Sequence, residues 1–160
     1  MIAKKKLAVL GIATGALTLA IAGPVIAHHA FGAEFDKDAP IRLEGEIVRL
    51  EWVNPHSWIH LSIVDDSGEQ ILDEDGEPEV WMVEGGTPNV LLRRGLRRDC
   101  LQPGTTIIVD GYQAKDHSLN RANGRDVTFA DGTKIFMGSS GTGAPDDAER
   151  MRQRQEQGRC

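Results

Sequence analysis

Histidine is the residue type in this 160-residue chain that best suits coordination chemistry. Neutral imidazole binds first-row transition metals, and nitrogen-rich sites favour Cu(II) by the Irving–Williams order. The chain has five histidines: His28, His29, His56, His60 and His117. A metal site is therefore a hypothesis that the spacing of these residues has to support.

The histidine spacing limits which of these side chains can share an ion. If the segment between them is extended, His56 and His60 lie about 13 Å apart at roughly 3.3 Å per residue, while a metal–imidazole bond is about 2 Å long. His56 is the favoured ligand of the two, because it directly follows the turn signal Asn54-Pro55, where it can reorient. The alternative, an ordinary hydrogen-bonded histidine, is favoured for His60 and for His117.

Segment 1–27 has the three-part layout of a secretory signal peptide. Lys4-Lys5-Lys6 precedes an uncharged apolar stretch at 7–22, and Val25-Ile26-Ala27 supplies a cleavage site. We expect export to the periplasm with cleavage after Ala27, and cleavage after Ala22 is the alternative. A permanent membrane anchor is the weaker interpretation, because the apolar stretch is shorter than the roughly 20 residues that a bilayer span needs.

Cleavage after Ala27 makes His28 the amino terminus of the mature chain. An amino-terminal histidine offers a metal its free α-amine as well as its imidazole, and the imidazole of His56 would add a third nitrogen. This ligand set suits Cu(II). His29 and His117 are secondary candidates for the same ion, and no other cofactor is indicated.

The composition argues against several classes of function. The chain has 24 acidic and 18 basic residues, and this net acidity argues against nucleic acid as the partner. No serine lies in a nucleophile motif, and the acidic segment 65–78 does not match an EF-hand loop, so we expect no enzymatic activity. The two cysteines, Cys100 and Cys160, either pair in the exported chain or remain free or intermolecular.

The periodicity of apolar residues predicts one mainly β domain at 41–138. Alternation of apolar and polar residues predicts four strands, at 41–52, 57–64, 79–84 and 105–112. A closing hairpin or a split fifth strand follows at 125–129 and 134–137. The residues expected in the core are Ile47, Ile59, Leu61, Val83, Ile107 and Val109.

A change of period after Gly86 marks a short helix between the third and fourth strands. Thr87 caps it, Pro88 occupies its first position and Gly95 ends it. This order predicts a small five-stranded OB-like barrel, with an open β-sandwich as the alternative. Residues 28–40 are expected to form an extended arm. Residues 139–160 are expected to be a disordered tail, because they contain almost no apolar residue to bury.

Several motifs spread along the mature chain occur together. They are His28-His29-Ala30-Phe31, the run at 51–56 that ends in Asn54-Pro55-His56, the segments 83–89 and 91–95, and the segment 111–116. In these motifs the chain resembles an uncharacterised family of exported proteobacterial proteins with HHSF-like and WVNPH signatures. Ala30 replaces the usual serine. The resemblance implies export and a small barrel-like domain, and it implies no established activity.

The candidate residues for contacts with a ligand or partner are Trp52, Asn54, Trp58 and His60. Alternation places Trp58 on the strand face opposite Ile59, next to His60. We therefore expect an exported small binding or accessory protein that acts in the periplasm through its barrel face, with an envelope protein or a small ligand as its partner. The alternative is a periplasmic Cu(II)-binding protein that uses the mature amino-terminal histidine.

The signal-peptide interpretation makes one direct prediction. Amino-terminal sequencing of the protein from the periplasmic fraction should begin at His28. A chain that begins at Gly23 would remove the α-amine of His28 from any site, and full-length protein in the cytoplasm would contradict export.

Overall fold

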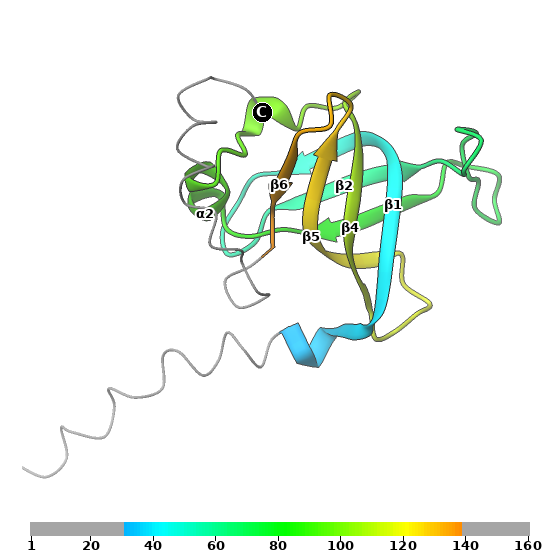
Figure 1. The fold of residues 1–160 in the computed structure, drawn as a ribbon. Coiled ribbons are helices and arrows are strands. Elements are labelled where there is room, and N and C mark those ends of the chain that lie inside the picture. The colour runs from blue at the N-terminus through cyan, green and yellow to red at the C-terminus, as the bar shows by residue number, and fades with distance from the viewer. Residues whose placement is uncertain (1–30, 139–160) are drawn as a thin grey trace, which may run out of the picture.

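Six strands form one closed sheet in the computed structural model, which describes residues 31–138 (Figure 1). The strands are β1 (Phe35–Glu51), β2 (Trp58–Ile63), β3 (Val80–Glu84), β4 (Thr106–Ala114), β5 (Arg121–Phe129) and β6 (Lys134–Phe136). Helix α2 (Pro88–Arg93) and the 3-10 helix η1 (Arg98–Cys100) follow β3 and precede β4. The fold is therefore mainly β, as the sequence predicts.

The sheet closes because its third strand pairs with its fifth. The strand order is β3-β2-β1-β4-β5-β6, and β3 also pairs with β5. That contact is parallel, through Met82↔Arg121, Val83↔Ala122 and Glu84↔Asn123, whereas the other pairings are antiparallel. Ring closure leaves the long strands without a free edge, which removes a template for aggregation.

The long strand β1 has a paired strand on each side. Its residues pair with β2 on one side and with β4 on the other, and Gly45 is opposite both Ile63 and Ile107. A Cβ on Gly45 would lie 2.0 Å from the backbone oxygen of Ser62. Glycine is required here because the backbones of β1 and β2 approach more closely than a side chain permits.

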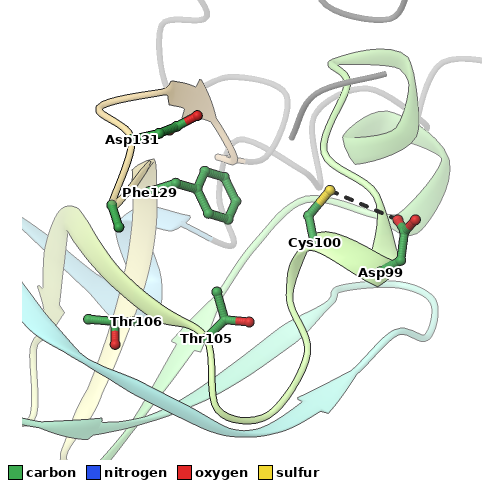
Figure 2. A pocket seen from close by; sticks show the side chains of 7 residues that line it. Asp99, Cys100, Thr105, Thr106, Phe129 and Asp131 are labelled. Carbon is green, nitrogen blue, oxygen red and sulfur yellow. Dashed lines mark hydrogen bonds between the residues drawn. The ribbon is translucent and has the colours of Figure 1, made fainter. Parts of the chain in front are cut away.

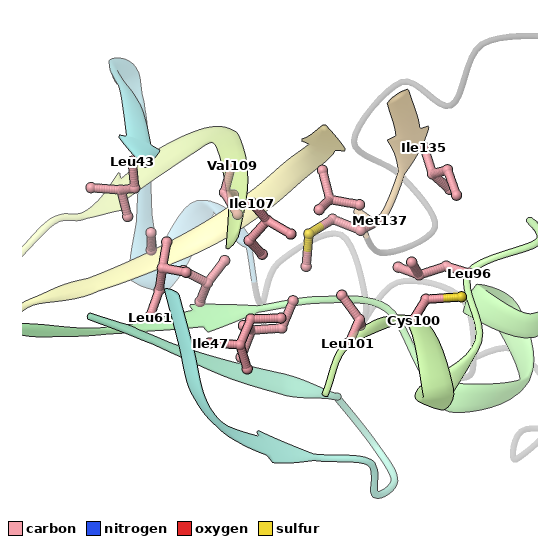
Figure 3. Close-up of a cluster of buried hydrophobic side chains, with 14 of the residues drawn as sticks. Leu43, Ile47, Leu61, Leu96, Cys100, Leu101, Ile107, Val109, Ile135 and Met137 are labelled. Atoms are coloured by element: carbon pink, nitrogen blue, oxygen red, sulfur yellow. The ribbon is translucent and has the colours of Figure 1, made fainter. Parts of the chain in front are cut away.

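The core fills the inside of the ring (Figure 3). All six side chains that the sequence places in the core are at most 1% exposed: Ile47, Ile59, Leu61, Val83, Ile107 and Val109. Leu91 of α2 and Leu101 after η1 join the same cluster. The helical segment therefore contributes apolar side chains to the sheet interior.

Local signals in the sequence correctly locate α2. The hydroxyl of Thr87 accepts a hydrogen bond from the backbone N–H of Val90 at 3.3 Å, and Pro88 begins the helix. Gly95 follows with φ +85°, a left-handed conformation that glycine adopts without strain.

The structure corrects the strand count and two strand boundaries. It has six strands instead of the expected five, because Lys134–Phe136 forms a separate strand that pairs with β5. β1 begins at Phe35, so part of the expected arm at 28–40 is a strand of the sheet. β5 begins at Arg121, ahead of the expected 125. The signal segment 1–27 and the tail 139–160 lie outside the described residues.

Within residues 31–138, no helix is long and apolar enough to cross a membrane.

The close approach at Gly45 predicts a large loss of stability on substitution. Gly45→Ala should lower the free energy of unfolding by about 3 kcal/mol, because the added Cβ overlaps backbone that cannot move without breaking strand pairing. Gly32→Ala is the control, since no atom lies within 4 Å of its added Cβ. Urea unfolding followed by circular dichroism measures both. Equal stability of the two variants would contradict the interpretation.

Candidate functional site

The outward face of β2, β3 and β5 carries polar and aromatic side chains in register. Trp58 is opposite Glu84 and His60 is opposite Met82, while Arg121 and Asn123 align with Met82 and Glu84. Their neighbours Ile59, Leu61, Val83 and Ala122 point into the core. We use the name outward face for Trp58, His60, Met82, Glu84, Arg121 and Asn123.

Two members of the outward face are buried although they are polar. Glu84 is 7% exposed and Asn123 is 1% exposed. The side-chain amide of Asn123 donates a hydrogen bond to Oε1 of Glu84 at 3.3 Å. The same carboxylate oxygen lies 3.3 Å from Nδ1 of His56, which precedes β2. His56 therefore lies at the end of the ring where β3 and β5 meet.

Burial dominates the electrostatics of Glu84. Removal from water raises the pKa of this carboxyl above its ordinary value, because the charged form loses hydration. His56 and Arg121 act in the opposite direction, Glu34 adds to the rise, and the hydrogen bond from Asn123 lowers the pKa. The net shift is upward, so the fold holds an acid that is costly to ionise unless positive charge is supplied.

Buried polar atoms without a hydrogen-bond partner gather around Glu84. Among residues 31–138, four side-chain atoms are of this kind: His56 Nδ1, Ser57 Oγ, Arg121 Nε and Asn123 Oδ1. Three of them, on His56, Arg121 and Asn123, belong to residues that interact with Glu84, whereas Ser57 only follows His56 in the chain and pairs through its backbone with Gly85 and Gly86. We call His56, Glu84, Arg121 and Asn123 the Glu84 cluster. Each unpartnered group costs about 1–3 kcal/mol, so their concentration marks a site that the fold does not satisfy by itself.

Arg121 connects the Glu84 cluster to the amino-terminal segment. Its guanidinium lies over the Trp58 ring, 4.5 Å from the ring centroid, and its Nη2 lies 2.7 Å from Oε1 of Glu34. The backbone of Glu34 also accepts a hydrogen bond from the N–H of Lys115. These contacts fix residue 34 beside the cluster, only six residues after His28.

His60 forms a separate pair. Its Nε2 lies 2.9 Å from Oε1 of Glu51, a carboxylate that also pairs with Arg49. The His60 side chain is 13% exposed. This arrangement is that of a hydrogen-bonded structural histidine.

The other residues predicted for the site lie in different parts of the structure. Trp52 is partly buried and packs against the core, whereas Asn54 and His117 are exposed in loops. Trp58 and His60 share the outward face. His28 and His29 lie outside the described residues, and within residues 31–138 no three histidine, cysteine or acidic side chains form a metal-binding group.

Sequence reasoning missed Glu84, Arg121 and Asn123. The available signal at Glu84 was an acid at the last position of an apolar strand, directly before Gly85-Gly86. Nothing local links Glu84 to Asn123, because only the β3–β5 pairing brings them together.

A hollow lies between η1, the start of β4 and the turn from β5 to β6 (Figure 2). It is lined by Asp99, Cys100, Thr105, Thr106, Phe129, Ala130 and Asp131. Sγ of Cys100 lies 3.9 Å from Oδ1 of Asp99, and Cys100 is disulfide-bonded. Cys160, the other cysteine in the sequence, lies outside the described residues. The hollow contains none of the predicted site residues.

Comparison with known proteins gives a family and no activity. The model of a family of unknown function (DUF6152) matches residues 16–123. This range includes His28, His29, His56 and every member of the Glu84 cluster. No curated protein matches the chain.

The buried carboxyl predicts a pH-dependent effect of Glu84→Gln. Because the folded-state pKa is raised, the stability linked to the proton on Glu84 is present in acid and is lost as pH rises through that pKa. Glu84→Gln removes this loss, so the variant should be more stable than the parent at pH 7, by on the order of 1 kcal/mol, and similar to it at pH 4.

Chemical unfolding at the two pH values tests this prediction. Glu44→Gln, at an exposed position of β1, is the control and should change stability by less than about 0.5 kcal/mol at either pH. An equal effect of Glu84→Gln at both pH values would contradict the assigned cost of the charge.

Proposed function

The chain belongs to this family of unknown function, and we propose that it is an exported binding protein that acts in the periplasm through the outward face of β2, β3 and β5. The observation that carries the proposal is the concentration of unpartnered buried polar atoms in the Glu84 cluster. A fold keeps such groups at a cost of stability where they serve binding. The partner is a small ligand or an envelope protein that contacts the exposed and partly exposed side chains of this face, Trp58, His60 and Met82.

We further propose that the closed sheet is an OB-like barrel. In support, β1 pairs with both β2 and β4, β3 pairs with β5, and α2 lies between β3 and β4 in the chain. OB folds bind ligands on the face of their second and third strands. Here the corresponding face carries Trp58, His60 and Met82. The fold itself does not identify the ligand.

A second candidate function is Cu(II) binding at His56 and the mature amino-terminal His28. The observation that favours it is the anchoring of Glu34 to Arg121 within the Glu84 cluster. Six residues of chain span at most about 21 Å, so His28 is within chain reach of His56. The α-amine and imidazole of His28 and the imidazole of His56 would then bind the ion, with His29 or His117 as secondary ligands.

Copper titration of the correctly processed protein, followed by electron paramagnetic resonance, tests this function. We expect one Cu(II) with nitrogen ligands. Affinity should fall as pH drops through the imidazole range near about 6.5, because protons compete for the nitrogen ligands. One residue added before His28 displaces the free amine and should weaken binding roughly tenfold or more, and His56→Ala should do the same.

His60→Ala is the matched control, because His60 is also half of a histidine–carboxylate pair and lies outside the proposed ligand set. It should bind Cu(II) as the parent does. If the extended chain and His56→Ala both match the parent, the copper function is wrong. The broader proposal then depends on whether native mass spectrometry of protein isolated from the periplasm detects another bound molecule.

A further inference from the structure

We propose that a hollow on the outer surface of β1, β4 and β5 binds a small oxyanion, a carboxylate or phosphate carried on an apolar ring, between Arg42 and Arg125. These three strands are neighbours in the sheet (Figure 1). The site is separate from the outward face of β2, β3 and β5 and does not depend on copper binding. We call the hollow between Pro40, Arg42, Asp110, Tyr112 and Arg125 the Arg125 hollow.

Paired strands give the Arg125 hollow its walls and its floor. Two pairs of β1 and β4 residues point outward and form the walls, Pro40↔Tyr112 and Arg42↔Asp110. The backbone of Ile41 and Gly111 lies between these pairs, because Ile41 packs against the core and Gly111 has no side chain. The volume of the hollow is about 330 Å³, which is within the range of small-molecule sites.

A β-bulge brings Arg125 to this hollow. Asp110 is opposite Asp126, but the next residue, Gly111, is opposite Gly124, so Arg125 is the extra residue of β5. Arg125 is exposed and lines the hollow. Bulges redirect a side chain and are over-represented beside functional sites. The bulge thus adds a cation to this surface that regular pairing of β4 with β5 would not place there.

Carboxylates orient both arginines and leave them accessible. Nη1 of Arg42 donates a hydrogen bond to Oδ1 of Asp110 at 2.9 Å, and Nη1 of Arg125 lies 3.4 Å from Oδ2 of Asp126. The Arg42 and Arg125 side chains are nevertheless 62% and 45% exposed. A guanidinium has five N–H donors in a planar fork that suits carboxylates and phosphates. Both arginines therefore keep donors for an anion.

Lys134 balances the two acidic side chains. Its Nζ lies 3.0 Å from Oδ2 of Asp110 and 3.6 Å from Oδ2 of Asp126. Although burial alone would raise it, the hydrogen bonds and charges of Lys134 and Arg42 lower the pKa of Asp110. Within residues 31–138 the network joins three basic side chains to two acidic ones, so it has a surplus of positive charge.

Tyr112 and Pro40 form the apolar side of the Arg125 hollow. The Phe31 ring meets the Tyr112 ring edge-on with 5.8 Å between the centroids, and Phe31 also contacts Phe35, which is buried. These contacts hold the Tyr112 ring in place. A fixed aromatic ring next to two arginines suits a ligand with an apolar ring and an anionic group, and the Tyr112 hydroxyl adds a hydrogen-bond donor.

Titration of the processed, isotope-labelled protein with phenyl phosphate, benzoate and inorganic phosphate, followed by nuclear magnetic resonance, tests the site. We expect saturable shifts at the backbone amides of Ile41, Arg42 and Gly111. An aromatic anion should bind more tightly than inorganic phosphate, and the tighter of the two aromatic anions identifies the charged group. Arg42→Gln and Arg125→Gln should each weaken binding about tenfold or more, because each removes a charged hydrogen-bond donor.

Arg98→Gln is the matched control, because it removes the same charge from an exposed arginine outside the hollow. Its affinity should stay within about twofold of the parent, since salt screens distant charges. Arg125→Lys keeps the charge without the planar fork and should give a smaller loss than Arg125→Gln. Circular dichroism confirms that each variant is folded.

The outcomes that would overturn the proposal are distinct. They are the lack of saturable shifts with all three anions, shifts confined to residues outside the hollow, and an equal loss of affinity in Arg98→Gln and Arg125→Gln, which would indicate general attraction by charge. Inorganic phosphate bound as tightly as both aromatic anions would contradict the role of Tyr112 and Pro40 and overturn the assignment of a ring-bearing ligand.

Discussion

Closure of the ring between β3 and β5 places polar groups where water cannot reach them. Only three pairs make this contact, and strand alternation divides them between two environments. Val83 and Ala122 point inward and are fully buried in the core. Glu84 and Asn123 point to the opposite face and are buried there as well. The contact that completes the fold is thus also the one that builds the Glu84 cluster.

The strands around this contact approach one another so closely that two positions require glycine. A Cβ on Gly111 would lie 2.3 Å from the backbone oxygen of Asn123, and one on Gly124 would lie 2.8 Å from Cγ1 of Val83. β4 and β3 can therefore pack tightly against the start of β5. In the sequence, Asn123-Gly124 has the form of a hairpin turn, but tertiary pairing keeps it within a strand.

Much of the fold could be predicted from local patterns, and the boundaries show where these patterns end. Strands such as β2 alternate because one side packs in the core, and α2 has its cap and proline in sequence. The start of β1, which contains Asp36-Lys37-Asp38, lacks that alternation, and its pairing with β4 is irregular, because the register shifts between Phe35 and Pro40. The start of β5 could not be predicted either, because residues 121–124 are held in the sheet by pairing with β3 and β4 and have no clear alternation. At the site, the type and turn position of His56 made it a candidate, whereas Glu84 and Asn123 meet only through a pairing 39 residues apart.

The proposed copper site joins two events that are separate in the sequence. Cleavage after Ala27 would create the free α-amine of His28. The ion pair between Glu34 and Arg121 holds residue 34 near the end of the ring where His56 lies. Before cleavage the amine is an amide and cannot bind, so the ligand set would be complete only in the processed, exported protein. The Glu84 cluster would already be folded before the ligand binds, with its unpartnered polar groups buried. On this proposal, the cost of those groups is the cost of a site organised in advance for a ligand that arrives after export.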